Sequence, residues 1–146
     1  MIDDPVSVVL RMNETFNAAT RDLDAYAALY SVDCEITDTA SGEVYRGPEG
    51  ARQQLESYLV SFPDAHEEIV HMIAQGEWVA IEGFEHGTHT GPLSTADGDS
   101  VRPTGKAIKI PFCDILQVKN GKIVQRRDQF NWAMVEQQLG LTPKRP

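Results

Sequence analysis

The sequence predicts an α+β fold in which helices cover one face of a curved antiparallel sheet. In the first third of the chain, apolar residues recur at helical spacing, whereas from His66 onward apolar and polar residues alternate as in half-buried strands. Asn120 and Gly121 separate two of the alternating segments, and this pair is typical of a hairpin with a type I′ turn. Helices that precede a run of antiparallel strands are typical of the α+β class.

Three helices are expected before the long strands and one after them. Asp4 suits the N-cap of the first helix, because Pro5 follows at the first helical position. Asp22 suits the start of the second helix, and Pro63 ends the third. Gly140 lies where a glycine commonly ends a helix. The apolar spacing places the four helices at residues 5–16, 22–30, 46–62 and 132–139.

The strands are expected to follow one another with short connections. A weak strand signal covers residues 33–37, and four long alternating segments lie at residues 67–74, 77–89, 107–118 and 123–130. The stretch of residues 91–105 is rich in Gly, Pro, Ser and Thr. Such a long loop at a strand crossover is a candidate rim for a pocket.

Length and composition indicate a soluble protein with one domain over residues 1–146. The formal charge of −9 disfavours binding to nucleic acid or to an anionic membrane, and no apolar run approaches the ~20 residues of a membrane span. The acidic start MIDDP does not resemble a secretory signal, so the cytoplasm is the expected location. Cys34 and Cys113 lack the spacing of zinc or redox motifs and are expected to be small buried residues.

The Asn120–Gly121 turn also predicts how the last two strands pair. If these two residues form the loop, Lys119 faces Lys122 and the pairing continues outward from there. Asp114 then lies in an otherwise apolar row, directly opposite Arg127. The two residues form either a structural ion pair at the edge of the core or the polar floor of a cavity.

Other polar residues give weaker indications of chemistry. His86 and His89 fall on opposite faces of one strand, so they cannot both face a cavity, and without a matched third ligand no metal site is expected. Asp38 follows the first strand and is either a turn carboxylate or part of the cavity mouth. The sequence has no nucleophile, phosphate-loop or dinucleotide motif, which leaves cofactor-free chemistry or simple ligand binding.

Five short motifs along the chain resemble those of a known family. They are YRGPEGARQQL (residues 45–55), GTHTG (87–91), PTGK (103–106), NGKIV (120–124) and QQLGL (137–141). Together with the element order, they make residues 6–143 similar to SnoaL-like polyketide cyclases and ester-cyclase-type proteins of the nuclear-transport-factor-2-like superfamily. The resemblance implies a cone-shaped α+β fold around a pocket, commonly a homodimer, without a metal or an organic cofactor.

The resemblance also bears on the acid–base residues. In cyclases of this kind, an Asp at the end of the last strand is the acid or base for an aldol ring closure. Asn131 stands at that position here, and Asp128 stands where the family often has a second acid. The predicted register places Asn131 in the pocket and directs Asp128 away from it.

The leading hypothesis is therefore a cofactor-independent cyclase- or isomerase-type enzyme that acts on a small apolar carbonyl compound. The alternative is a ligand-binding or accessory domain that has lost catalysis, for which Asn131 is the supporting feature. We expect an enclosed cavity of a few hundred Å³ and a homodimer formed through the outer sheet face. Catalysis is assigned to Asp114, Arg127, Asn131 and His89, and substrate binding to Tyr30, Asp38, Tyr58, Phe112, His86 and Gln129.

Overall fold

The α+β class, the curved sheet and the short C-terminal helix are confirmed by the structure, a computed structural model in which residues 4–95 and 98–141 are described. The helices are α1 (Pro5–Phe16), the 3-10 helix η1 (Ala18–Thr20), α2 (Leu23–Ala28), α3 (Gly47–Ser61) and α4 (Trp132–Gln138). The strands are β1 (Tyr30–Asp38), β2 (Val44–Arg46), β3 (His66–Gln75), β4 (Trp78–Thr88), β5 (Leu93–Ser94), β6 (Ser100–Val101), β7 (Ala107–Lys119) and β8 (Lys122–Phe130).

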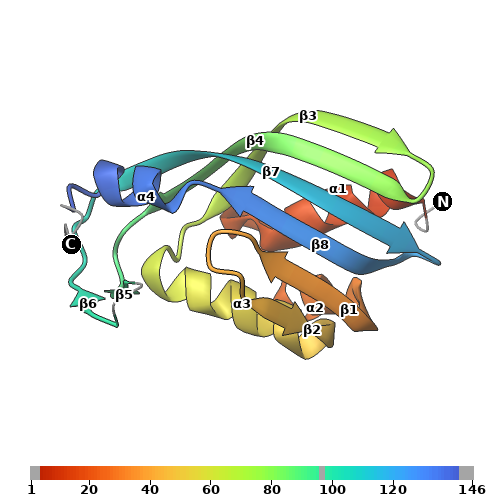
Figure 1. The fold of residues 1–146 in the computed structure, drawn as a ribbon, viewed down its shortest axis with the longest axis horizontal. Helices are drawn as coiled ribbons and strands as arrows, with labels where there is room; N and C mark the ends of the chain where they lie inside the picture. The colour runs from red at the N-terminus through yellow and green to blue at the C-terminus, as the bar shows by residue number, and fades with distance from the viewer. Residues whose placement is uncertain (1–3, 96–97, 142–146) are drawn as a thin grey trace.

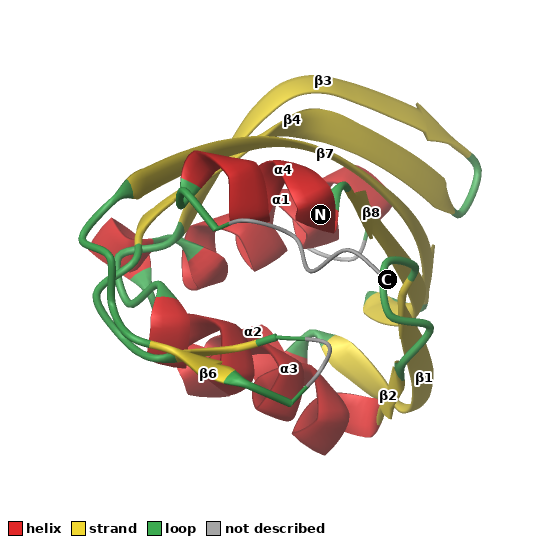
Figure 2. Cartoon of the chain, turned by 60° about the vertical axis from the view of Figure 1, so that its left-hand side comes forward, coloured by secondary structure: helices red, strands yellow, loops and turns green. Residues whose placement is uncertain are grey.

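Six strands form one curved sheet in the order β2-β1-β8-β7-β4-β3 (Figure 1). The sheet is mixed, because β1 pairs with β8 in parallel whereas the other neighbours are antiparallel. The expected all-antiparallel sheet was therefore wrong at this one pairing, which joins two strands from opposite ends of the chain. Figure 2 shows the sheet curving over α1, with α2 and α3 on its open side. We call the concave surface the inner face and the convex surface the outer face.

The predicted helix ends agree with their capping residues. Asp4 accepts a hydrogen bond from the backbone N–H of Ser7 at 3.0 Å, and Pro5 occupies the first turn of α1. Gly140 adopts a φ of 75° just after α4, a conformation that glycine takes without strain. The second helix ends earlier than expected, so Tyr30 begins β1, although its side chain remains buried.

The loop expected at residues 91–105 contains the small hairpin β5–β6. This hairpin, α4 and the C-terminal end of α3 all lie at the left end of the molecule in Figure 1. Among the residues that the structure describes, no helix is long and apolar enough to cross a membrane.

The pairing of β7 with β8 differs from the predicted register, and this difference changes which residues form the site. Asn120 and Gly121 have φ angles of 51° and 75°, as a type I′ turn requires, and Lys119 pairs with Lys122 as predicted. However, Val118 pairs with Ile123 whereas Gln117 pairs with Gln125. Val124 is the extra residue of a β-bulge, and every later pair in β8 is displaced by one residue.

Candidate active site

Four carboxyl groups and one guanidinium group meet on the inner face of the sheet. The carboxyl groups come from four neighbouring strands: Glu67 from β3, Glu85 from β4, Asp114 from β7 and Asp128 from β8. Arg126, also on β8, lies among them. Glu67, Asp114 and Arg126 are only 4%, 2% and 4% exposed. Buried charges of this kind are costly unless they are paired or neutralised, so their contacts define what the site can do.

Arg126 is held by hydrogen bonds on both sides of its guanidinium group. Its Nη2 and Nε donate to Oδ2 of Asp114 at 2.8 and 3.2 Å. Its Nη1 donates to the hydroxyl oxygens of Tyr26 and Tyr30, both at 2.8 Å. The Tyr30 hydroxyl in turn donates to that of Tyr26 at 2.9 Å. Burial alone would lower the pKa of Arg126, but the nearby carboxylates outweigh it and hold that pKa well above its usual value.

Asp114 faces inward as predicted, but the prediction of its partner was wrong. The bulge at Val124 turns Arg126 inward and leaves Arg127 opposite Ile115 on the outer face, where it is exposed. Burial raises the pKa of Asp114 well above its usual value; Asp128 and Glu67 add to this rise, and Arg126 opposes it.

Asp128 also points inward, contrary to the predicted register. Its Oδ1 lies 2.7 Å from Nε of Arg126, and its Oδ2 accepts a hydrogen bond from the side-chain amide of Gln54 at 2.9 Å. Gln54 comes from α3, so this contact joins the helix layer to the sheet. The Asp128 side chain is 17% exposed, compared with 3% for Asp114, so Asp128 lies nearer to solvent.

Glu67 and Glu85 are direct cross-strand neighbours. Glu67 is buried and Glu85 is half-buried. Burial raises the pKa of Glu67 well above its usual value, and burial also raises the pKa of Glu85, to about 7. The Tyr58 hydroxyl lies close to both carboxyl groups, and burial raises its pKa as well, so this hydroxyl stays protonated.

Several buried polar atoms of the site have no hydrogen-bond partner among the described residues. They are Oη of Tyr58, both carboxyl oxygens of Glu67 and Nε2 of His89, whereas Oδ1 of Asp128 has an ion pair with Arg126 but no hydrogen bond of regular geometry. Nδ1 of His89 accepts a hydrogen bond from the backbone N–H of Thr104 at 3.1 Å, so a neutral ring carries its proton on Nε2. The site therefore offers unpaired donors and acceptors in a dry environment, which is what proton transfer to a bound molecule requires.

The structure brings five of the ten predicted site residues to the inner side of the sheet. Asp114, Tyr30 and Tyr58 join the carboxyl cluster, and Phe112 is buried on the same face. His89 is fully buried just beyond β4, with its ring centroid 5.6 Å from that of Phe62.

The other five do not join the cluster, for reasons seen in their own contacts. The bulge places Arg127 and Gln129 on the outer face. Asn131 was expected in the pocket, but it is exposed and caps α4 by accepting a hydrogen bond from Ala133 N at 3.0 Å. The remaining two are His86, whose Nε2 lies 3.0 Å from Oε1 of Glu68 on the outer face, and Asp38, which accepts from Ala40 N at 2.9 Å in a turn.

Glu67, Glu85 and Arg126 were missed by the sequence analysis, although two of them left a signal. Glu85 has the same strand parity as the buried residues Val79 and Ile81, so the alternation of β4 already directs it inward. Glu67 then follows as the cross-strand neighbour of Glu85. Arg126 had no such signal, because the bulge decides its face.

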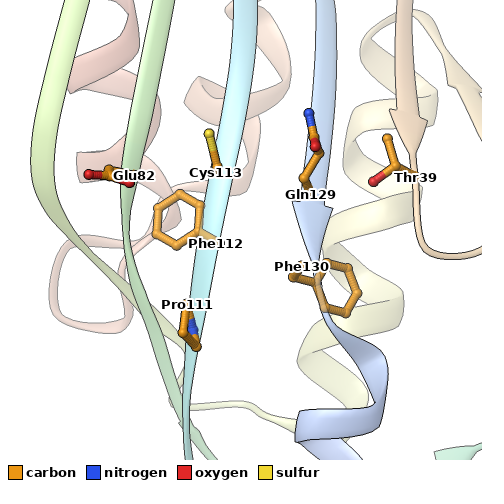
Figure 3. Close-up of a pocket in the computed structure, with 7 residues that line it drawn as sticks. All are labelled: Thr39, Glu82, Pro111, Phe112, Cys113, Gln129 and Phe130. Carbon is orange, nitrogen blue, oxygen red and sulfur yellow. The ribbon is translucent and has the colours of Figure 1, made fainter.

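The shallow hollow shown in Figure 3 lies on the outer face, away from the carboxyl cluster. Its volume is about 430 Å³. Glu82, Cys113 and Gln129 lie side by side across it on neighbouring strands. Its lining is Thr39, Glu82, Pro111, Phe112, Cys113, Gln129 and Phe130, which shares Phe112 and Gln129 with the predicted site residues.

Comparisons with known proteins agree with this fold. Residues 7–139 match the family described as SnoaL-like polyketide cyclase. A candidate SnoaL-like polyketide cyclase from Jannaschia sp. CCS1 has a similar structure, with a TM-score of 0.81, 19% identity and coverage of 95% of this chain and 93% of that one. IdmH, a candidate polyketide cyclase from Streptomyces antibioticus, gives a TM-score of 0.77 with 23% identity, covering 94% and 99% of the two chains.

A third similar structure carries a different description. The protein from Catenulispora acidiphila DSM 44928 with a ketosteroid isomerase-like fold, in complex with trimethylamine, gives a TM-score of 0.76 at 18% identity. The alignment covers 92% of this chain and 93% of that one. Comparison with curated protein sequences gave no match. At these identities the similar structures establish the fold alone.

Proposed function

The chain belongs to the SnoaL-like polyketide cyclase family, and from this premise we propose that it catalyses a cofactor-independent ring closure or isomerisation of a small apolar carbonyl compound. Both reactions remove a proton from a carbon next to a carbonyl group and return a proton elsewhere, usually to oxygen or to another carbon. Positioned side chains that transfer these protons accelerate such steps by roughly 10²–10⁴-fold.

One observation carries the proposal: the inner-face cluster contains buried polar atoms with no hydrogen-bond partner among the described residues. Native proteins rarely leave such atoms unpaired, since each costs about 1–3 kcal/mol. A bound substrate with carbonyl and hydroxyl oxygens would supply the missing partners. The unpaired atoms also include both donors and acceptors, which an acid–base mechanism needs.

In this proposal, Asp128 is the base that removes the proton from carbon. Its Oδ1 lies 2.7 Å from Nε of Arg126, and the Gln54 amide donates a hydrogen bond to its second oxygen. Arg126 and Asp114 are positioning residues, because their hydrogen bonds hold Asp128 and the two tyrosines in place. Tyr58 and His89 donate hydrogen bonds to substrate oxygens and stabilise the negative charge that develops there.

Partly buried apolar side chains at the end of the molecule near α4 support an apolar substrate. Phe130, Trp132 and Met134 are partly buried there and pack against the hydrophobic core. Leu59, near the C-terminal end of α3, is also partly buried against the core. We place the substrate entrance between these two elements, on the side of the cluster where Asp128 is nearest to solvent.

The alternative of a catalytically degenerate binding domain depended on Asn131. Since Asn131 caps α4 at the surface, its lack of an ionisable group has no bearing on the acid–base groups of the inner face. We therefore favour the enzyme hypothesis.

Deuterium uptake at carbon provides the test. A panel of β-ketoesters and polycyclic ketones is incubated in D₂O, and NMR measures exchange of the C–H next to the carbonyl. We expect the protein to accelerate exchange and Asp128→Asn to reduce the acceleration by about 100-fold or more. Asp38→Asn is the matched control, because Asp38 pairs with Asp128 across the parallel strands but its side chain accepts a hydrogen bond from the turn after β1. Equal exchange with both variants would contradict the assignment of Asp128.

A further inference from the structure

We propose that Glu67 and Glu85 hold one proton between their two carboxyl groups, and that this pair is the acid which protonates the substrate oxygen. The one-proton state of the pair stands on its own, whereas the delivery of the proton depends on the function proposed above. Nothing in the family match assigns a role to either residue.

Register and alternation bring the two carboxyl groups together. Glu67 on β3 and Glu85 on β4 are partners across an antiparallel pair, and both side chains are on the inner face. From α1, Asn13 donates a hydrogen bond to the backbone oxygen of Glu67 at 3.1 Å, and Asn17 accepts one from its backbone N–H at 2.7 Å. These contacts fix the Glu67 backbone while leaving its carboxyl group without a donor.

The charges around the pair do not balance two carboxylates. The contacting cation is Arg126, whose Nη2 is 3.5 Å from Oε2 of Glu67, beyond ordinary hydrogen-bond length. That guanidinium group is already bonded to Asp114 and paired with Asp128. The other titratable groups that act on the pair are Tyr58 from α3, Asp114 from β7 and Asp128 from β8. All of these neighbours except Arg126 are acidic, so the site disfavours two charges on Glu67 and Glu85.

A shared proton accounts both for the missing donor of the Glu67 carboxyl group and for the excess of acidic groups around the pair. With one proton, a carboxylic acid O–H can donate to the neighbouring carboxylate, and the pair carries a single negative charge instead of two. The shared proton also gives a hydrogen bond to the Glu67 carboxyl group, whose oxygens have no other hydrogen bond among the described residues.

The Tyr58 hydroxyl is an independent sign that a ligand approaches this pair. Its oxygen is buried beside Glu85 and makes no hydrogen bond of regular geometry among the described residues. Glu85 is half-buried, whereas Glu67 is 4% exposed. A substrate oxygen can therefore reach Glu85 and Tyr58 together, while Glu67 stays behind them as the store of the proton.

The proposed step balances for an aldol ring closure. Asp128 takes the proton from the carbon beside one carbonyl, and the resulting electron pair forms a bond to the carbon of a second carbonyl. The π electrons of that second C=O move to its oxygen, which takes the proton from the Glu67–Glu85 pair. Transfer of the proton from Asp128 back to the pair, directly or through water, restores the starting state. No proton is gained or lost overall.

The first test needs no substrate. In wild-type protein labelled with ¹³C at the glutamate carboxyl carbons, NMR follows the titration of Glu67 and Glu85, with single Gln variants used for assignment. We expect one proton to remain on the pair into the neutral range, and in Glu85→Gln we expect Glu67 to titrate at lower pH, because Glu85 raises the pKa of Glu67. Glu68, the neighbour of Glu67 on the exposed face, is the internal reference. If both residues titrate together with Glu68, the shared proton is refuted.

The second test separates the acid from the base. On a substrate that wild-type protein cyclises, we expect Glu85→Gln to reduce turnover by about 100-fold while deuterium uptake at carbon persists. Glu68→Gln should leave both unchanged. Unchanged turnover in Glu85→Gln would overturn proton delivery and leave Asp128 as base. If wild-type protein catalyses no exchange at all, the proposed function fails, and the titration still decides whether the pair shares a proton.

Discussion

Replacing Glu85 with glutamine should remove a pH-dependent loss of stability. Burial raises the pKa of Glu85 from 4.5 to about 7 in the folded protein. Between these two pH values, the folded protein binds more protons at Glu85 than the unfolded chain does, so the free energy of unfolding falls as pH rises. Below this range the carboxyl group is neutral in both the folded and the unfolded state, so Glu85 does not lower the free energy of unfolding. Above it, the loss is complete.

The size of the effect follows from the same pKa difference. Raising the pKa from 4.5 to about 7, at about 1.4 kcal/mol for each pKa unit, corresponds to a loss of about 3.5 kcal/mol above neutral pH. Burial is the main cause of this rise in pKa; Glu67 and Tyr58 oppose it, and the charges of Asp114 and Asp128 add to it. Against a typical unfolding free energy of about 5–15 kcal/mol, the loss is large enough to measure.

Urea denaturation at several pH values from about 5 to about 8 provides the measurement. The wild-type free energy of unfolding should fall over this range more steeply than that of Glu85→Gln, and the variant should be the more stable of the two at the alkaline end. Glu82→Gln is the matched control, because Glu82 lies on the exposed face of the same strand. If wild type and Glu85→Gln have parallel pH profiles, Glu85 does not bear the cost of a buried charge.

Three further predictions concern the hairpin, the last helix and the outer face. Arg126→Met should cost about 3–5 kcal/mol in urea denaturation because it leaves a buried carboxylate unpaired, whereas Arg127→Met should cost about 0.5 kcal/mol or less; equal costs would contradict the bulged register. Asn131→Asp should preserve stability and Asn131→Ala should cost about 1 kcal/mol, with deuterium exchange unchanged in both; a loss of exchange would return Asn131 to the active site. Ile73 and Trp78, 71% and 43% exposed, should form part of a homodimer interface, so sedimentation should give a dimer for wild type and a monomer for Trp78→Arg. A wild-type monomer at micromolar concentration would refute the dimer.

Local sequence signals predicted the elements of this fold but not all of its pairings. Helix caps, apolar spacing and the Asn120–Gly121 turn act over a few residues, and the structure agrees with each of them. The parallel pairing of β1 with β8 joins residues about ninety positions apart, which no turn motif specifies. The short strand β2 also escaped prediction, because three residues are too few to show an alternation.

The candidate site was predicted correctly on β7 and incorrectly on β8, and a single bulge accounts for the difference. Asp114 lies in a regular alternation with Phe112 and Leu116, so its inner-face position follows from the pattern. On β8, two apolar residues stand together at Ile123–Val124, and two arginines stand together at Arg126–Arg127. Doubled residues of one kind fit either register, so the alternation of β8 alone cannot decide between them.

The burial of side chains farther along β8 explains why the bulged register is the stable one. Without the bulge, Gln125 and Gln129 would face inward, and each buried amide without partners would cost about 1–3 kcal/mol. With the bulge, both glutamines lie on the outer face and Phe130 pairs with the buried Phe112. The same shift moves Asp128 next to Arg126 on the inner face. The bulged register, which keeps the two glutamine amides in water, therefore also assembles the acid–base cluster. A sequence search for this site must consider Gln125, Gln129 and Phe130 together with the charged residues.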